Sequence, residues 1–126
     1  MRVLNPPTVA KPASHYAQAI EHGNGRRLVI SGQVGVTPDG TIVDGYEAQA
    51  RQTWANILAI LNAANMTMTD LVSIRVYDVA PGNVAAYRAI RDEVLNGHLI
   101  AATYVIVAGL ASPNFLIEIE AEAVKI

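Results

Sequence analysis

The chain has 126 residues, 52% hydrophobic and 16% charged, so it is long enough for one domain, residues 1–126, with a buried core. Nine basic against eleven acidic residues, without a basic cluster, argue against a nucleic-acid-binding protein, and the absence of cysteine excludes disulfides, thiolate nucleophiles and cysteine-ligated metals. The apolar runs are too short to span a membrane and the N-terminus lacks a secretory segment, so we expect a cytoplasmic protein.

The first third of the chain is predicted to contain strands and turns. Residues 14–20 form one extended piece, and Gly23-Asn24-Gly25 after it is typical of a hairpin turn. The short β-branched run at residues 27–33 predicts a buried strand. Pro38-Asp39-Gly40 then predicts a turn into a brief strand at residues 41–43.

A long helix is predicted from Asp44 to about Ala64. Asp44 and Glu47 have the spacing of a capping pair that satisfies backbone N–H groups at a helix start. Apolar side chains recur at the spacing of one buried helix face, namely Trp54, Ile57, Leu58 and Leu61. Asn65 can adopt the left-handed conformation that ends a helix.

The second half is predicted to contain another helix between strands. The strand at residues 71–77 comes first, and a helix begins near Pro81 or Asn83 and stops at Gly97. Its buried side chains are expected to be Tyr87, Ile90 and Val94. Two strands, residues 103–107 and 115–126, close the chain on either side of a turn at Ser112-Pro113-Asn114.

Two of these strands have one apolar and one polar face. In an extended chain alternate side chains point the same way, so the closing strand directs Glu118, Glu120 and Glu122 away from its apolar side chains. The strand at residues 71–77 likewise directs Ser73, Arg75 and Tyr77 away from Val72, Ile74 and Val76. A functional site is therefore expected on this polar side of the sheet.

The element order indicates an α+β protein in which two helices cover one face of a mixed sheet. Residues 103–107 are apolar on both faces, and the chain provides no cover for the second one. We therefore predict self-association, with the polar residues of the open face near the subunit contacts.

Several segments together resemble the RidA/YjgF-like family, the reactive-intermediate deaminases formerly described as L-PSP endoribonucleases. They are Ser31-Gly32-Gln33, residues 49–56, Asn62-Ala63-Ala64 and residues 117–121. The resemblance implies a chorismate-mutase-like fold, a homotrimer with the helices outside, and a cleft at each subunit boundary. It also implies hydrolysis of enamines and imines of 2-amino acids to 2-oxo acids and ammonia, without a metal or organic cofactor.

The resemblance assigns site residues by position. Tyr16 matches a cleft tyrosine, Gly32 a glycine whose backbone lines the cleft, and Glu118 the carboxylate that positions water. The family's signature arginine falls on Ala102, beside Thr103. Since alanine cannot replace the two charge-assisted hydrogen bonds of a guanidinium, we expect a divergent member that is not an efficient 2-iminoacid deaminase.

Each candidate also has a plainer explanation. Glu118 is either the catalytic carboxylate or part of a solvated strand face. Arg75 either supplies the lost anion-binding charge or, as the favoured alternative, pairs with a glutamate of the open face. Tyr104 either lines the pocket or, as favoured, packs in an interface. The full set of expected cleft residues is Tyr16, Ser31, Gly32, Arg75, Tyr77, Ala102, Thr103, Tyr104 and Glu118.

Two functions remain open from the sequence. The first is a hydrolase or deaminase-like enzyme in which Glu118 assists the addition of water to a small imine-type or enamine-type metabolite. The alternative is a non-catalytic trimer that binds a small molecule or has a regulatory role. Neither requires a nucleic acid, a membrane or a cofactor, and the spacing of His15, His22 and His98 does not suit a metal site.

Overall fold

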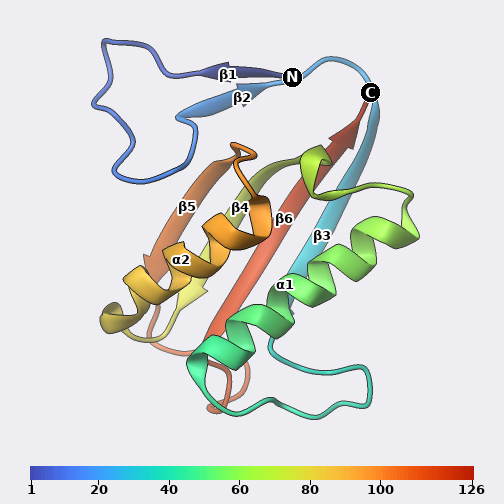
Figure 1. Ribbon diagram of the computed structural model, residues 1–126. Helices are drawn as coiled ribbons and strands as arrows, with labels where there is room; N and C mark the ends of the chain where they lie inside the picture. Colours follow the sequence, from blue (N-terminus) through green and yellow to red (C-terminus); the bar gives the residue numbers. More distant parts are fainter.

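A four-stranded mixed sheet forms the centre of the computed structural model, which describes residues 1–126 (Figure 1). Its strand order is β3-β6-β4-β5, and β6 runs antiparallel to both of its neighbours while β4 and β5 are parallel. The strand bounds are β3 Arg26–Val34, β4 Leu71–Asp78, β5 Ala101–Ile106 and β6 Ile117–Lys125. The apolar alternation of β6 places it next to the middle of the core, as predicted.

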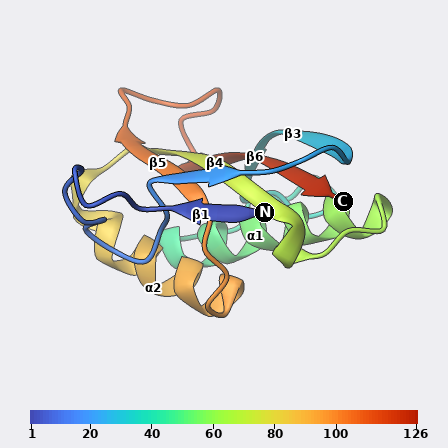
Figure 2. The ribbon, with the colours of Figure 1, turned by 90° about the horizontal axis from the view of Figure 1, so that it is seen from above.

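Two helices cover one face of this sheet, α1 (Tyr46–Ala63) and α2 (Val84–Leu95). Figure 2 shows both helices on the same side, so the predicted one-sided α+β arrangement is confirmed. The core between the layers is built from fully buried side chains of α1, α2 and β6, among them Trp54, Ile57, Leu61, Tyr87, Ile117 and Ile119. Short 3₁₀ turns precede β4 and α2, at Met68–Asp70 and Pro81–Asn83.

The N-terminal segment forms a separate two-stranded sheet. In it, β1 (Arg2–Leu4) pairs antiparallel with β2 (Ala19–Glu21). The predicted hairpin turn at residues 23–25 is therefore wrong, because β2 pairs with β1 rather than with β3. The predicted strand at residues 41–43 is also wrong as a strand, since only an isolated bridge joins Val36 and Ile42.

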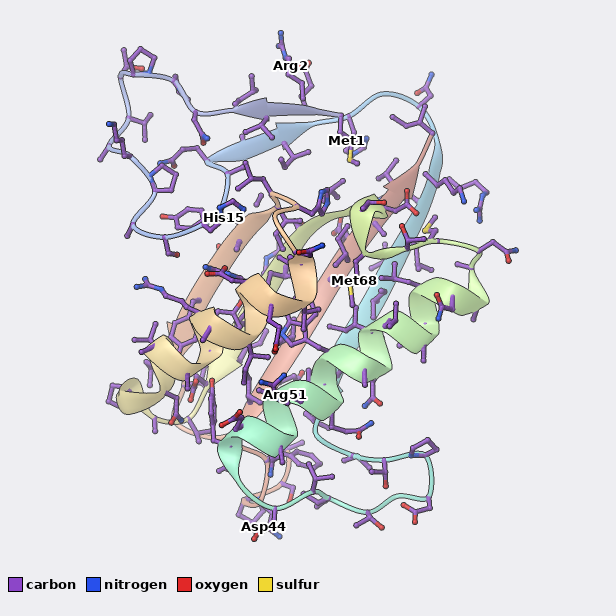
Figure 3. All side chains as sticks on the ribbon, viewed as in Figure 1. Met1, Arg2, His15, Asp44, Arg51 and Met68 are labelled. Atoms are coloured by element: carbon purple, nitrogen blue, oxygen red, sulfur yellow. The ribbon has the colours of Figure 1, made fainter.

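The helix ends differ partly from expectation. Gly45, with φ of 90°, precedes α1 and no side chain caps the helix, so the predicted capping by Asp44 and Glu47 is wrong. The Glu47 carboxylate instead lies 3.4 Å from the guanidinium of Arg51, one turn along. Arg51 also pairs with Glu93 of α2 at 2.5 Å, which ties the two helices together (Figure 3). The left-handed Asn65, with φ of 56°, confirms the predicted helix end.

The second face of the sheet is covered by neither helix. Val29 of β3 and Val105 of β5 are 64% and 40% exposed, which is unusual for valines in strands. No helix of the structure is long and apolar enough to cross a membrane. The open face therefore carries both apolar and polar side chains, and neither helix covers it.

Candidate functional site

The strand register places the polar side chains of the open face in rows. Glu118 of β6 lies opposite Tyr77 of β4, and Glu120 lies opposite Arg75. On the other side of β4, Arg75 lies opposite Thr103 of β5. Because facing residues in neighbouring strands point to the same side of a sheet, these five side chains share one surface. The sequence-based expectation of a polar open face is confirmed.

Glu118 lies against Gly32 at an irregularity in β3. The register with β6 shifts between Ile30 and Gln33, which indicates a bulge around Gly32. A Cβ atom at Gly32 would lie 1.9 Å from Oε2 of Glu118, so only glycine leaves room for the carboxylate in this position. No hydrogen bond or ion pair of the chain occupies the Glu118 carboxylate, which leaves it available to a water molecule or a ligand.

Polar side chains of α1 hold the end of β3 in place. Asn56 donates from Nδ2 to the carbonyl oxygens of Val34 at 3.1 Å and Val36 at 3.0 Å. Gln49 is 2% exposed and bonds Val43 O at 3.1 Å, Asn114 O at 2.8 Å and Leu116 N at 2.9 Å. These amides fix the segment that follows β3 and the turn that precedes β6, which lie at the same end of the sheet. Their role in this chain is to position backbone.

The neighbouring glutamates already have partners. The Tyr77 hydroxyl donates to Glu120, and this hydrogen bond is the main cause of a raised Tyr77 pKa. Arg27 of β3 donates from Nη2 to Glu122 at 2.9 Å. Arg75 makes no ion pair, so the favoured prediction that it pairs with a glutamate is wrong in this chain. Glu120, directly opposite Arg75, is bound by the Tyr77 phenol, and Glu122, one diagonal position away, is bound by Arg27.

Ala102 and Tyr104 lie on the other face of the sheet from Glu118. Both pack against the hydrophobic core beneath the helices. The Tyr104 hydroxyl donates to Oδ2 of Asp78 at 2.6 Å, and its ring centroid lies 5.1 Å from that of Tyr87 on α2. Thr103, which lies between them in β5, points to the open face and is exposed. The expected cleft residues therefore fall into two sets on opposite faces.

Tyr16 and Gly32 also lie at opposite edges of the sheet. Ala17, next to Tyr16, makes a parallel bridge to Ala101 at the outer edge of β5. Ser31 and Gly32 lie on β3 at the opposite edge. With strands about 4.8 Å apart, three spacings separate these edges by about 14 Å. One chain alone therefore does not bring Tyr16 to Gly32, and Glu118 on β6 is only one strand nearer.

The hollows of the single chain lie away from Glu118. One of about 400 Å³ lies at the end of the sheet, lined by residues 108–110 with Val79 and Phe115 among others. His15 is exposed and its Nε2 lies 3.3 Å from Gly97 O, near the end of α2 (Figure 3). No group of three His, Asp or Glu side chains is gathered closely enough to hold a metal ion. On the open face, Glu118 is thus a carboxylate without a hydrogen bond or ion pair from its own chain.

Sequence reasoning missed a buried acid beside the site. Asp78 at the end of β4 is fully buried and accepts hydrogen bonds from Tyr46 Oη at 2.7 Å, Tyr104 Oη at 2.6 Å, Ala80 N at 3.0 Å and Asn83 Nδ2 at 3.2 Å. Burial, followed by the hydrogen bond to Asp78, raises the pKa of both tyrosines above the ordinary value. The alternation of apolar and polar residues in β4 gives no signal that Asp78 is buried, because strands often end in an acidic residue.

Arg91 was missed as well. It lies on the buried stripe of α2, one turn after Tyr87, and its guanidinium carbon is 5.8 Å from the centroid of that ring. Its Nε donates to Oδ1 of Asp92 at 3.0 Å, and Nη1 donates to Oγ of Ser14 at 3.3 Å. The available signal was its spacing, four residues from Tyr87 and from Leu95. A charged residue at such a position is normally assigned to the solvent side.

The family model described as Endoribonuclease L-PSP matches residues 7–125. The chain belongs to this family, the RidA/YjgF-like proteins. A RutC family protein of Pyrococcus horikoshii is 38% identical over 117 residues, which cover 91% of this chain and 90% of the relative. A 2-iminobutanoate/2-iminopropanoate deaminase of Salmonella typhimurium is 36% identical over 116 residues, 87% of each chain.

The solved structures agree with this assignment. The Rid-family protein YyfB of Yersinia pestis, described as a protein of unknown function, has a TM-score of 0.91 and 37% identity over 98% of both chains. RidA of an Antarctic Psychrobacter has a TM-score of 0.76 and 28% identity over 99% of this chain and 100% of that one. The expected RidA/YjgF fold is therefore confirmed for this Rid-family chain.

Proposed function

We propose that this RidA-family chain hydrolyses a small imine-type or enamine-type metabolite in a cleft between neighbouring copies of a homotrimer. The observation that carries the proposal is the Glu118 carboxylate, which lies over Gly32 without a hydrogen-bond partner. The family membership supports the reaction class, since curated relatives include 2-iminobutanoate/2-iminopropanoate deaminases. The proposed setting is the cytoplasm, and the proposed partners are a small metabolite and other copies of the chain.

Self-association follows from the separation of the site residues. Tyr16 lies beside the outer edge of β5, which carries Thr103 on the open face, whereas Gly32 and Glu118 belong to the β3 side. A neighbouring copy whose β5 edge lies beside β3 completes the set. The exposed valines of the open face support burial against another copy, because apolar side chains in strands gain free energy when removed from water.

The chemistry needs only water and a base. Glu118 accepts a proton as water adds to the carbon of the C=N bond, and returns it to the nitrogen to give the amino alcohol. The hydroxyl proton then passes to the nitrogen, the C–N bond breaks, ammonia leaves and the carbonyl forms. The overall balance is imine plus water to carbonyl plus ammonia, with no oxidation or reduction. The Gly32 backbone leaves space for the water beside the carboxylate.

Because of Ala102, we expect slow hydrolysis of one class of substrate, the 2-imino acids. An arginine here would hold a 2-imino acid by two charge-assisted hydrogen bonds, and losing such a contact costs about 2–5 kcal/mol. That corresponds to roughly two to four decades in kcat/KM. We therefore expect freshly generated 2-iminopropanoate to be hydrolysed far more slowly than by relatives that have the arginine.

The test compares turnover in matched variants. Ammonia release from 2-iminopropanoate and from a panel of neutral and anionic imines is measured for wild type, Glu118→Gln and Gly32→Ala. We expect Glu118→Gln to lose about 10²-fold or more, as for removal of a general base. Gly32→Ala should also lose activity because the new methyl group displaces the carboxylate. Full activity in Glu118→Gln, or turnover of 2-iminopropanoate at the rate of arginine-containing relatives, would contradict the proposal.

A non-catalytic binding trimer is the second candidate, favoured by the alanine at position 102 and by the absence of Glu118 from the hollows of the single chain. Under this alternative Glu118→Gln leaves ligand affinity nearly unchanged and no imine is hydrolysed. Size-exclusion chromatography with light scattering tests the shared requirement, since a stable monomer at micromolar concentration would leave both functions without a complete site.

A further inference from the structure

The hydroxyl group of Tyr77 lies on the open face beside Glu118 and has no role in the reaction described so far. Tyr77 of β4 lies directly opposite Glu118 of β6. Residues in such a pair have Cβ atoms about 5 Å apart. The Tyr77 hydroxyl donates a hydrogen bond to Oε1 of Glu120, which is the next residue of β6 on the same face. One phenol and two carboxylates therefore share a small part of this surface.

The hydrogen bond to Glu120 fixes the direction of the phenol proton. Because the Tyr77 hydroxyl donates to this carboxylate, its oxygen keeps lone pairs that can accept a second hydrogen bond. The same hydrogen bond is the main cause of the raised Tyr77 pKa, and the charge of Glu118 raises it further, so the phenol stays protonated at neutral pH. Tyr77 thus offers an acceptor oxygen, with a carboxylate next to it that can take the phenol proton.

The spacing of Glu118 and Glu120 suits one small reacting centre between them. The two residues are separated by two steps of β6, which is about 6.6 Å along the strand. A hydrogen bond between oxygen or nitrogen atoms spans about 2.7–3.0 Å. A carbon atom that carries one oxygen and one nitrogen can therefore contact the Glu118 carboxylate on one side and the Tyr77 hydroxyl on the other.

The breakdown of the amino alcohol contains one proton transfer to which no side chain has been assigned. The hydroxyl oxygen and the nitrogen are bonded to the same carbon, and the hydroxyl proton must reach the nitrogen before ammonia leaves. Direct transfer needs a strongly bent arrangement, and hydrogen bonds weaken steeply below about 120°. A neighbouring group that accepts one proton and returns another therefore accelerates this step.

We propose that Tyr77 is a second catalytic residue, which carries this proton with Glu120 as its partner. The hydroxyl proton of the amino alcohol passes to Oη of Tyr77 while the phenol proton passes to Oε1 of Glu120. Glu120 then returns its proton to the phenol oxygen, and the phenol gives a proton to the nitrogen. The C–N bond breaks, ammonia leaves, the carbonyl forms, and both side chains are back in their starting state without oxidation or reduction. The inference rests on the proposed function, in which Glu118 assists the addition of water.

The test separates the rate of the reaction from the binding of the substrate. Ammonia release from freshly generated 2-iminopropanoate, and from a panel of neutral imines, gives kcat and KM for wild type, Tyr77→Phe and Glu120→Gln. Each variant should lower kcat at least about tenfold, because it removes one half of the relay, and leave KM within about twofold. The double variant should lose no more than the larger of the two single losses, since both residues act in one pathway.

Glu122→Gln is the matched control. Glu122 is the next carboxylate along the same face of β6 and also has a partner, the guanidinium of Arg27. Its replacement removes an equal charge without touching the relay, so kcat should stay within about twofold of wild type. Tyr77 is only half-buried and phenylalanine keeps its ring, so Tyr77→Phe should unfold at nearly the wild-type temperature.

The outcomes distinguish this proposal from the proposed activity. Wild-type turnover with an unchanged kcat in Tyr77→Phe would overturn the relay, because water or Glu118 then carries the proton, and would leave the proposed reaction intact. A higher KM at an unchanged kcat would also overturn it, since Tyr77 would then only bind the substrate. Equal losses in Glu120→Gln and Glu122→Gln would reduce the effect to surface charge. If wild type releases no ammonia from any imine tested, the relay and the proposed function both fail.

Discussion

Asp78 and Arg91 are the two charged residues buried beneath the helices, and they are satisfied very differently. Asp78 accepts four hydrogen bonds from two phenols, a backbone N–H and an amide. Arg91 is almost as deeply buried, yet its only carboxylate comes from the next residue along the chain, and one oxygen of Asp92 contacts both Nε and Nη2. A buried charge is tolerated in a folded protein where hydrogen bonds or an opposite charge compensate for its lost hydration, and Asp78 has more of these partners than Arg91.

Removal of the Asp78 carboxylate should cause the largest loss of stability and tests this comparison most directly. Asp78→Ala leaves the hydroxyls of Tyr46 and Tyr104 and the amide of Asn83 without their acceptor. Each stranded donor costs about 1–3 kcal/mol, so we expect unfolding in urea to show a loss of about 3–5 kcal/mol.

Asp78→Asn is the matched control, since it keeps the size and one acceptor oxygen and should lose clearly less. If Asp78→Ala is as stable as an exposed-site variant such as Arg88→Ala, the four hydrogen bonds do not have the structural role assigned to them.

The second-largest expected effect is a loss of stability at alkaline pH. Burial is the main cause of the raised pKa of Tyr46, Tyr87 and Tyr104. The folded protein therefore keeps these phenols protonated above about pH 10, where the unfolded chain releases their protons. Since the unfolded state then binds fewer protons, the free energy of unfolding should fall as pH rises above that value.

Tyr87, the most deeply buried of these tyrosines, should contribute about 1.4 kcal/mol per pH unit to this fall. Urea midpoints measured from pH 8 to pH 11 check the slope, and Tyr87→Phe should make it shallower. A slope that is the same in wild type and Tyr87→Phe would show that this phenol ionises as readily in the folded protein as in the unfolded chain.

Much of the framework could be predicted from local patterns. The alternation of β6, the apolar stripe of α1 and the left-handed Asn65 each follow from a periodicity or a backbone preference of a few neighbouring residues. The pairing of β1 with β2 could not, because two three-residue strands separated by fourteen residues carry no alternation long enough to detect. The prediction of an Asp44 cap was wrong because Gly45, with a positive φ, occupies the position before the helix.

The candidate site was predictable only on its open face. Glu118, Arg75 and Tyr77 share a surface because strand alternation requires it. Arg91 could not be found in the same way, since a helix pattern assigns charged residues to the solvent side. Its burial depends on Ser14, 77 positions away along the chain, and on the Tyr87 ring beneath it. Contacts of this kind belong to the tertiary structure, and no sequence spacing encodes them.

The smallest expected effect compares two neighbouring phenols whose rings touch. Tyr104→Phe removes a hydrogen bond to the buried Asp78 carboxylate and should cost about 1.5–3 kcal/mol. Tyr87→Phe removes a hydroxyl that has no partner, so at pH 7 the free energy of unfolding should stay within about 0.5 kcal/mol of wild type or rise. Urea unfolding of the two variants gives both values. A loss in Tyr87→Phe as large as in Tyr104→Phe would mean that the Tyr87 hydroxyl is already bonded within the folded protein.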